Sequence, residues 1–517
     1  GTALFRCRST NRPVTPALYR HGGSLLMTNH FKVKEFYLED YEATLFPMET
    51  CRLLVERSNE SLSSYIEKIA NPKEKDFCFL PQETVYACKA KHHLRRTMKL
   101  DPVAEYFLYE MTYKNRKIFR KSKSESRENF GYRFFDGKPI PIHQSYSDFV
   151  ARAKDLKSKF EYFIKFDISA YFNSIYHHDI TNWFSAQKPT QSDMEMFGRF
   201  MREINSGFSI DFLPHGIYPS KMLGSHFLSF MDDSELLRCE HLIRFMDDYM
   251  IFSDSKDTLI RDFQVIQKGL GQKSLNINSD KTVLFSDGPA LIEEKIDEIK
   301  QGIKEKIYIG SGSGIDQEDY VESVRALSKQ ETEYLISLMD EDLATDYEAS
   351  LILDCIHEHG NNFAQYVPDF IYKFPHLAKR VFHKCSSVED KEGLSDRLIN
   401  LVKDAQTLNE HQLFWIAKIV ESYLLSVSSV GSLLALLYEH KDATNISKAK
   451  ILEIPELRFG MPEWREVHLK NGSSGWLAWA SAVGMRNDTK QARNYLMGYF
   501  SKVSPMNKLI GDCIVSL

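Results

Sequence analysis

The spacing of hydrophobic residues divides the chain into two parts with different expected secondary structure. Up to about residue 305, short segments with every second residue apolar alternate with segments of helical period. After residue 316, apolar residues recur three and four positions apart, as on one face of a helix. The clearest helical segments are 343–359, 361–382, 411–427 and 491–503. We therefore predict a mixed α/β part followed by an all-helical part.

The helical part is interrupted by single glycine and proline residues, and alternation typical of strands is scarce. This pattern favours antiparallel helix pairs stacked as a short HEAT-like array, with an irregular helical bundle as the alternative. The sequence GSGSG at 310–314 is the most flexible stretch and marks the boundary. The predicted divisions are an arm or tag remnant at 1–26, the α/β part at 27–305, a linker at 306–315, and the helical part at 316–517.

Composition and charge narrow the class of protein. The 517 residues carry a net charge of −5, which excludes a wholly basic, histone-like protein. Residues 89–133 nevertheless contain 13 Lys or Arg against 5 Asp or Glu, so a local basic surface is expected. Uncharged apolar runs stay below the about 18 residues that a membrane span needs, so no membrane span is expected. The 8 cysteines form no CxxC pair, which indicates thiols in a reducing cytoplasm.

Two segments place carboxylates at the ends of predicted strands. The sequence FIKFDISAYF (163–172) alternates like a strand and carries Asp167. In HLIRFMDDYMIFSDS (241–255), two apolar runs flank Asp247 and Asp248, which predicts a tight hairpin with both carboxylates at its tip. Two adjacent buried carboxylates are costly unless a cation offsets their charge. A second MDD, at 231–233, has a helical pattern, and we interpret it as a solvated helix face.

Two further segments complete an ordered set. In LPHGIYPSKMLGSHF (213–227), Gly216 and Ser220 precede an apolar helix, as expected where the backbone approaches a base pair or nucleotide. In LNINSDKTVLF (275–285), Lys281 ends a turn that leads into a strand.

The order of these four segments resembles the palm of reverse transcriptases of the retron and group II intron type, and most closely the bacterial abortive-infection (Abi) reverse transcriptases of phage defence. Asp167 to Phe172 is similar to motif A of the family, and Gly216 to Ser220 to motif B. Phe245 to Asp248 is similar to motif C, and Lys281-Thr282 to motif D. The Abi likeness depends on 93–111, 130–140, SIYHH (174–178) and the long helical half. Two positions depart from the common pattern, namely His215 in place of Gln in motif B and Met246 before the Asp pair.

The resemblance implies α+β reverse-transcriptase fingers and palm, followed by an all-α helical-repeat (HEAT-like) C-terminal domain. It also implies nucleotidyl transfer with two Mg²⁺ ions, or Mn²⁺ in their place, because hard cations prefer carboxylate oxygens. Asp167, Asp247 and Asp248 are the expected catalytic and metal-binding residues. Phe172 falls where the family has an aromatic ring that excludes the ribose 2′-OH. The expected nucleotide-binding residues are Phe172, Arg95, Arg96, Lys99, Gly216, Ser220 and Lys281.

Three functions remain open at this stage. The first is a cytoplasmic antiphage DNA polymerase that uses dNTPs without a template, primed by a tyrosine, so that single-stranded DNA becomes covalently attached. The second is a template-copying reverse transcriptase with a partner RNA, and the third is a non-catalytic nucleic-acid sensor. The family also implies a homo-oligomer. Tyr37, Tyr41 and Tyr65 are unassigned candidates for the primer.

Overall fold

The computed structural model describes residues 24–121, 124–285, 329–341, 344, 346–358 and 363–517. The linker predicted at 306–315 and residues 1–23 of the predicted arm lie outside these residues. A mixed α/β part and a helical C-terminal part are both present, as the hydrophobic pattern predicted. No helix in the described ranges is long and apolar enough to cross a membrane.

The N-terminal residues form helices that pack around one buried helix, α4. Asp101 caps that helix by accepting hydrogen bonds from the backbone N–H groups of Val103 and Ala104, and Pro102 occupies its first turn, where no N–H is needed. Eleven of the residues of α4 are buried, so it is apolar on nearly all sides. The elements are α1 (Ser24–Tyr41), α2 (Glu49–Arg57), α3 (Asn59–Ala70) and α4 (Pro102–Lys114).

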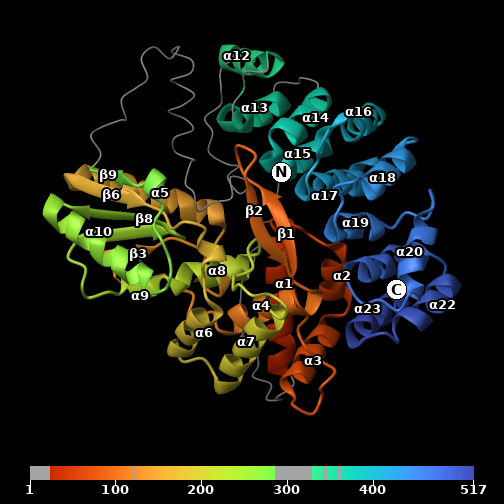
Figure 1. Ribbon diagram of the computed structural model, residues 1–517, viewed down its shortest axis with the longest axis horizontal. Helices are drawn as coiled ribbons and strands as arrows, with labels where there is room; N and C mark the ends of the chain where they lie inside the picture. Colours follow the sequence, from red (N-terminus) through yellow and green to blue (C-terminus); the bar gives the residue numbers. More distant parts are fainter. Residues whose placement is uncertain (1–23, 122–123, 286–328, 342–343, 345, 359–362) are drawn as a thin grey trace, which may run out of the picture.

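A two-stranded hairpin follows α3 in the chain and stands beside these helices. Strand β1 (Glu83–Cys88) pairs antiparallel with β2 (Leu94–Lys99), with Glu83 opposite Lys99. Its loop contains Lys91 and His92 in the left-handed region of backbone conformation. In Figure 1 the hairpin stands at the centre, with the large sheet to its left and the C-terminal helices to its right.

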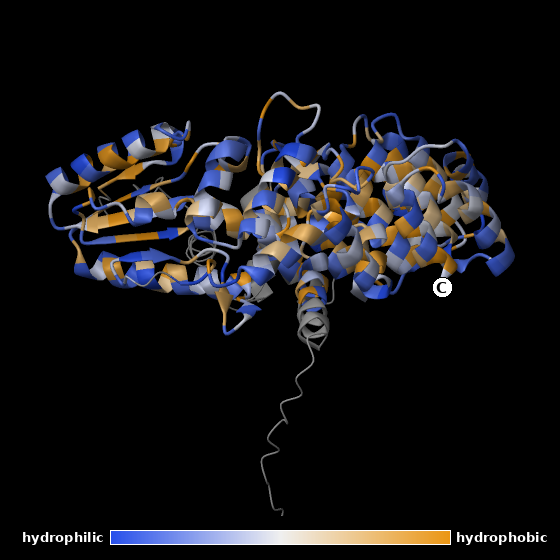
Figure 2. Ribbon diagram, turned by 90° about the horizontal axis from the view of Figure 1, so that it is seen from below, coloured by the Kyte–Doolittle hydropathy of each residue, from blue (hydrophilic) through white to orange (hydrophobic). Residues whose placement is uncertain are grey.

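The large sheet has five strands in the order β3-β7-β8-β6-β9. Its strands are β3 (Arg127–Asn129), β6 (Tyr162–Phe166), β7 (His241–Phe245), β8 (Asp248–Ser253) and β9 (Val283–Leu284). Only β3 and β7 pair in parallel, and every residue of β8 is buried. Helices α5 (Ile142–Lys159) and α10 (Lys256–Gly271) pack against the sheet. Figure 2 shows apolar strands, at its left, next to helices that alternate hydrophilic and hydrophobic residues.

The remaining elements of this part surround the sheet. They are β4 (Phe134–Phe135), β5 (Lys138–Pro139), η1 (Tyr171–Asn173), α6 (His177–Ala186), α7 (Gln191–Ile204), α8 (Tyr218–Phe227), α9 (Ser229–Asp232) and η2 (Ser279–Lys281).

The C-terminal helices form two rows that curve around the right side of the molecule in Figure 1. After α12 (Lys329–Asp340) and α13 (Asp346–Glu358), one row consists of α14 (Phe363–Lys373), α16 (Lys391–Asp404), α18 (Val430–Glu439), α20 (Met461–Lys470) and α22 (Lys490–Phe500). The other row consists of α15 (Ala378–Lys384), α17 (Glu410–Ile419), α19 (Asn445–Leu452), α21 (Trp476–Gly484) and α23 (Pro505–Val515). Most members of each row pack on the next member of the same row. The second row faces the N-terminal part, since α17 packs on β1 while α21 and α23 pack on α2.

This arrangement agrees with stacked helix pairs, although the assignment to HEAT-like repeats stays a prediction. The described part of the predicted segment 361–382, residues 363–382, forms two helices, because the chain breaks at Pro375, which begins the short turn η4 (Pro375–Leu377). Two further short 3-10 turns are η5 (Cys385–Ser387) and η7 (Met485–Asn487), whereas η6 (Val420–Leu424) is a π-helical segment that continues α17.

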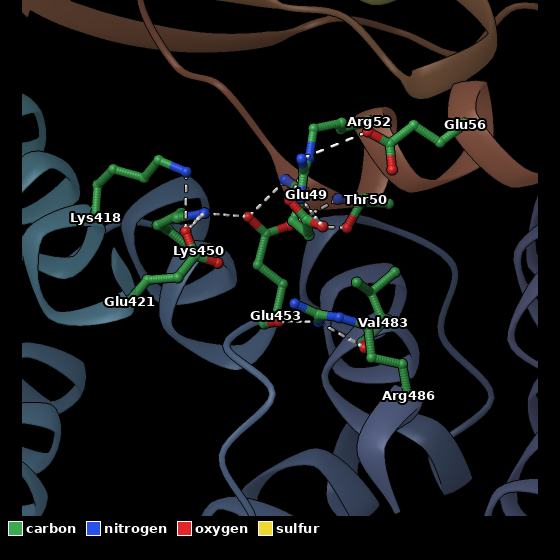
Figure 3. A network of polar contacts seen from close by, with 10 residues as sticks. All are labelled: Glu49, Thr50, Arg52, Glu56, Lys418, Glu421, Lys450, Glu453, Val483 and Arg486. Carbon is green, nitrogen blue, oxygen red and sulfur yellow. Dashed lines mark hydrogen bonds and ion pairs between the residues drawn. The ribbon is translucent and has the colours of Figure 1, made fainter. Parts of the chain in front are cut away.

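A buried charge network joins the two parts of the chain (Figure 3). The Glu453 carboxylate, which is fully buried, accepts hydrogen bonds from the backbone N–H groups of Glu49 at 2.8 Å and Thr50 at 3.0 Å. These N–H groups belong to the first turn of α2, which has no side-chain cap of its own. Lys450 bridges Glu453 at 2.7 Å and Glu421 at 2.6 Å. The network therefore supplies a helix cap across 400 residues of sequence and fixes α2 against α19.

Candidate active site

Strand pairing brings the predicted carboxylates to one edge of the sheet. Asp167 follows directly after β6, whose last residue, Phe166, lies opposite Tyr249 of β8. Asp167 is therefore level with the start of β8, where Asp248 is the first residue. Asp247 lies in the turn between β7 and β8, which confirms the predicted hairpin. All three residues come together because β6 and β8 are adjacent strands.

The hairpin turn is held by an ion pair that the sequence did not suggest. Met246, directly before Asp247, has φ +55°, a left-handed conformation that costs a residue other than glycine about 1–3 kcal/mol. The Arg244 guanidinium donates a hydrogen bond to the Met246 carbonyl at 3.0 Å and binds the Asp232 carboxylate at 2.6 Å. Asp232 is buried, so the expectation of a solvated helix face was wrong for this residue, although α9 is helical as predicted. The second MDD sequence thus supports the first.

A cavity of about 150 Å³ opens beside these carboxylates. It brings together predicted residues from the strand end, the hairpin turn, the basic hairpin and the region before β9. Its lining consists of Lys89, Arg95, Arg96, Asp167, Ile168, Ser169, Ala170, Tyr171, Phe172, Asn173, His215, Asp247, Asn278 and Lys281. Six residues singled out from the sequence therefore share one cavity, namely Asp167, Asp247, Phe172, Arg95, Arg96 and Lys281.

Negative charge is concentrated on one side of the cavity. The pKa of Asp247 is raised to about 7, mainly by burial and then by the neighbouring Asp248 and Asp167 carboxylates, while Lys89 opposes the shift. Lys281 Nζ lies 2.9 Å from Asp167 Oδ2. It reaches this position because Asn278 donates its backbone N–H to the Asp167 carbonyl and Ile168 pairs with Ile277. The segment before β9 thus extends the edge of β6 and brings Lys281 beside Asp167.

Phe172 is fixed on three sides. Its ring lies 4.3 Å from that of His215, edge to face, and 5.5 Å from that of Tyr171. A Cβ atom added at Gly224 would lie 3.2 Å from the Phe172 ring, so any larger residue there would press on it. Tyr171 is held in turn by its hydroxyl, which donates to the Gly224 carbonyl at 2.7 Å. A larger residue at 224 would therefore have to displace the Phe172 ring.

The positive side of the cavity comes from the β1–β2 hairpin. Arg95 Nη1 lies 3.5 Å from His215 Nδ1, and the Arg96 guanidinium lies 5.2 Å from the centre of the Phe212 ring. Lys89 and His215 also line the cavity, and sequence reasoning assigned neither to the site. The available signals were the position of Lys89 in the basic stretch and the substitution of His215 for the usual Gln.

Four predicted residues do not line this cavity. Lys99 is buried and paired with Glu105 at 2.5 Å, so its charge is already compensated. Gly216 has φ +108° and packs so closely on Leu45 that a Cβ atom would lie 2.8 Å from Leu45 Cδ1. Ser220 is fully buried within α8, and Asp248 is buried within β8 and not at the tip. Gly216 thus has the backbone conformation expected of glycine, and its close packing on Leu45 also leaves no room for a Cβ atom.

The carboxylates that line the cavity suit a hard cation, but only two of the three predicted metal ligands are among them. Asp167 and Asp247 supply carboxylate oxygens, which Mg²⁺ prefers, and the raised pKa of Asp247 reflects crowding that a cation would offset. Within the ranges that the structure describes, no group of three or more His, Cys, Asp or Glu side chains is arranged to hold a metal ion. The residues thus fit a divalent ion through two carboxylates, with Asp248 behind them.

Comparison with known proteins finds one family model that matches part of the chain. Residues 116–336 match the family model described as reverse transcriptase (RNA-dependent DNA polymerase). No curated protein matches the chain. Among solved structures, the telomerase of Candida albicans with the TWJ fragment of telomeric RNA is 12% identical, with a TM-score of 0.31, and the match covers 74% of this chain and 70% of that one. The apo telomerase of Candida tropicalis is 13% identical, with a TM-score of 0.33, and covers 76% and 71%.

Likenesses this weak to solved structures carry no functional information. The family match, by contrast, includes the segments that carry Asp167, Asp247 and Lys281, which the structure brings to one cavity. It implies a nucleotidyltransferase, and enzymes of this kind generally use divalent metal ions. Residues 116–336 are therefore similar to a reverse transcriptase domain, the polymerase fold that the sequence motifs predicted.

Proposed function

We propose that this protein is a DNA polymerase of the abortive-infection type, which joins dNTPs without a template and attaches the DNA to one of its own tyrosines. The observation that carries the polymerase proposal is the single cavity that combines Asp167 and Asp247 with Phe172, Arg95 and Arg96. Carboxylates for metal ions, cations for phosphates and a ring beside the sugar are the groups that nucleotidyl transfer requires. The finer assignment depends on the sequence resemblance and on the long helical C-terminal part.

Each residue has a proposed role in the reaction. Asp167 and Asp247 would hold the divalent ions, which when bound supply activation of the attacking oxygen and neutralisation of the triphosphate. Arg95 and Arg96 would contact the triphosphate, where charge gathers on the leaving pyrophosphate. Phe172 would exclude a ribose 2′-OH, because His215 and Gly224 keep its ring from moving aside.

The three tyrosines considered as primers from the sequence are buried in the structure. Tyr37, Tyr41 and Tyr65 all belong to the hydrophobic core, and the Tyr37 hydroxyl donates to Glu105 at 2.9 Å. A growing DNA strand cannot be attached to these three hydroxyl groups unless the core opens, so none of them is the proposed primer. Exposed tyrosines in the described ranges are Tyr86, Tyr176, Tyr372, Tyr495 and Tyr499.

A template-free labelling reaction tests the proposal. The purified protein is incubated with Mg²⁺ and each labelled dNTP, without RNA or primer, and analysed on a denaturing gel. We expect a ladder of DNA that migrates with the protein and is released by protease. Labelling only after RNA is added would instead support the template-copying alternative, which the family description favours. No incorporation under either condition would refute a polymerase and favour the nucleic-acid sensor.

A matched pair of variants ties the activity to the cavity. Asp167→Asn removes a carboxylate at the end of β6 that lines the cavity, and we expect it to abolish labelling. Asp254→Asn changes a carboxylate at the opposite end of the same strand pair, where it accepts the Glu161 N–H at 3.0 Å. This control should label like the unmodified protein, and equal loss in both variants would argue against the proposed site.

The remaining parts of the proposal concern assembly and organisation. We propose a palm and fingers at 27–305, a HEAT-like domain at 316–517, and a homo-oligomer in the cytoplasm. Size-exclusion chromatography with light scattering measures the oligomeric state directly, and a monomeric mass at all concentrations would refute that part.

A further inference from the structure

The outer edge of strand β1 is held by the helical C-terminal part. One edge of β1 pairs with β2, which leaves the backbone groups of the other edge to find partners elsewhere. The Tyr86 N–H donates to Glu410 Oε2 at 3.0 Å, and Cys88 Sγ donates to Asn409 Oδ1 at 3.1 Å. Asn409 caps α17 and Glu410 is its first residue, so the N-terminus of this helix faces the strand.

Glu410 is itself fixed from behind. Its carboxylate is buried and also accepts a hydrogen bond from the hydroxyl of Thr444, which caps α19. The N-termini of α17 and α19, which are neighbours in the second row, therefore together hold β1 in place. The far end of β2 also contacts the helical C-terminal part, since Lys99 Nζ lies 5.4 Å from the centre of the Trp476 ring of α21.

The same two strands carry the cations of the cavity. Lys89 directly follows β1, while Arg95 and Arg96 belong to β2, and all three line the cavity with Asp167 and Asp247. Arg96 is the register partner of Tyr86, the residue whose N–H is bound by Glu410. An isolated two-stranded hairpin is marginally stable at best, so its position depends on what holds it.

We infer that Glu410 is a positioning residue for nucleotide binding, and that the helical C-terminal part is a working component of the polymerase site. This inference rests on the proposed function. Glu410 is not among the residues that line the cavity. It fixes β1, and through the pairing of Tyr86 with Arg96 it fixes the cations that would contact the triphosphate.

The test compares three variants. Glu410→Ala removes the acceptor of the Tyr86 N–H, whereas Glu410→Gln retains an acceptor oxygen. Glu392→Ala is the matched control, because Glu392 also lies in the first turn of a helix of the array and accepts a backbone N–H and a hydroxyl, both from Ser428. It lies on α16, in the row that faces away from β1.

We expect Glu410→Ala to raise the KM for dNTP about tenfold, as for loss of a hydrogen bond to a charged group, with little change in kcat. Glu410→Gln should restore most of the affinity, and Glu392→Ala should leave the KM unchanged. Hydrogen exchange should show faster exchange across residues 83–99 in Glu410→Ala only. The inference is overturned if Glu410→Ala and Glu392→Ala have the same KM.

The exchange measurement separates the two proposals. If the unmodified protein incorporates no nucleotide but residues 83–99 lose protection in Glu410→Ala, the proposed polymerase function is refuted. The positioning of the β1–β2 hairpin by Glu410 is then still supported. If protection in 83–99 is the same in all variants, the positioning role is refuted whatever the activity.

Discussion

Glu453 offers the sharpest test of how the two parts of the chain are joined. Its carboxylate is fully buried and accepts four hydrogen bonds, from the Glu49 N–H, the Thr50 N–H and hydroxyl, and Lys450 Nζ (Figure 3). Glu453→Ala removes all four acceptor contacts. The two backbone N–H groups in the first turn of α2 would then be buried without partners, and Lys450 would keep only Glu421.

The expected loss follows from these contacts. Removing one member of a buried ion pair costs about 3–5 kcal/mol, because the charge left behind is uncompensated. Lys450 retains Glu421 at 2.6 Å, which reduces this part, but the unpaired N–H groups add about 1–3 kcal/mol. We therefore expect about 3–5 kcal/mol in total. Glu453→Gln keeps the shape and one acceptor oxygen, so its loss should be smaller.

Urea unfolding followed by tryptophan fluorescence measures this effect. Four of the 5 tryptophans, Trp415, Trp464, Trp476 and Trp479, lie in the helical C-terminal part, so the signal reports on that part. With an m-value of about 3 kcal/mol per molar urea, the unfolding midpoint should fall by about 1 M or more. Glu466→Ala, which removes an exposed pair with Lys470, is the control and should not shift the midpoint. Equal midpoints for Glu453→Ala and Glu466→Ala would refute the reasoning.

Three further predictions concern the site and the pH dependence. Phe172→Ala should lower the ratio of dNTP to rNTP incorporation, and an unchanged ratio would show that the ring is only a packing residue. Arg244→Ala should cost about 3–5 kcal/mol in thermal or urea unfolding, since it leaves Asp232 buried without its cation; a loss below about 1 kcal/mol, the scale of an exposed pair, would contradict this. Burial alone would raise the pKa of Glu421, but Lys450 and Lys418 outweigh it and lower the pKa to about 2. A lowered pKa stabilises the folded state above the unfolded value of about 4.3, and this stability is lost as pH falls towards 2; Glu421→Gln should flatten the stability profile there, and an unaltered profile would contradict the assignment.

The carboxylate site could be predicted from the sequence because each of its parts has a local signature. Asp167 ends an alternating segment, and Asp247 lies between two apolar runs of strand length, so both positions follow from periodicity. The hairpin and the two adjacent strands then bring them together. Lys281 could be placed for the same reason, since it lies just before a strand that pairs with the edge of β6.

The details of the nucleotide side could not be predicted, because they depend on packing between distant segments. Lys99 has the same local context as Arg95 and Arg96, yet it pairs with Glu105 of α4 and not with the cavity. Arg95 and Lys99 are four residues apart and share one face of β2, so strand alternation does not separate them; only the tertiary contacts at the two ends of the strand decide that Arg95 meets the cavity and Lys99 meets α4. In the sequence His215 stands out only as a departure from a motif, whereas in the structure its ring contacts Phe172.

By itself, the sequence determined the change from mixed α/β to helical structure and the strand ends that carry Asp167 and Asp247, because these depend on the order of nearby residues. Only the tertiary structure decided that Asp232 supports the Met246 turn, that Glu453 caps α2, and that Glu410 holds β1. Each of these contacts joins residues that are far apart in sequence or in different elements. A carboxylate in a sequence shows only that a charge needs a partner, and the partner is chosen when the chain buries that charge.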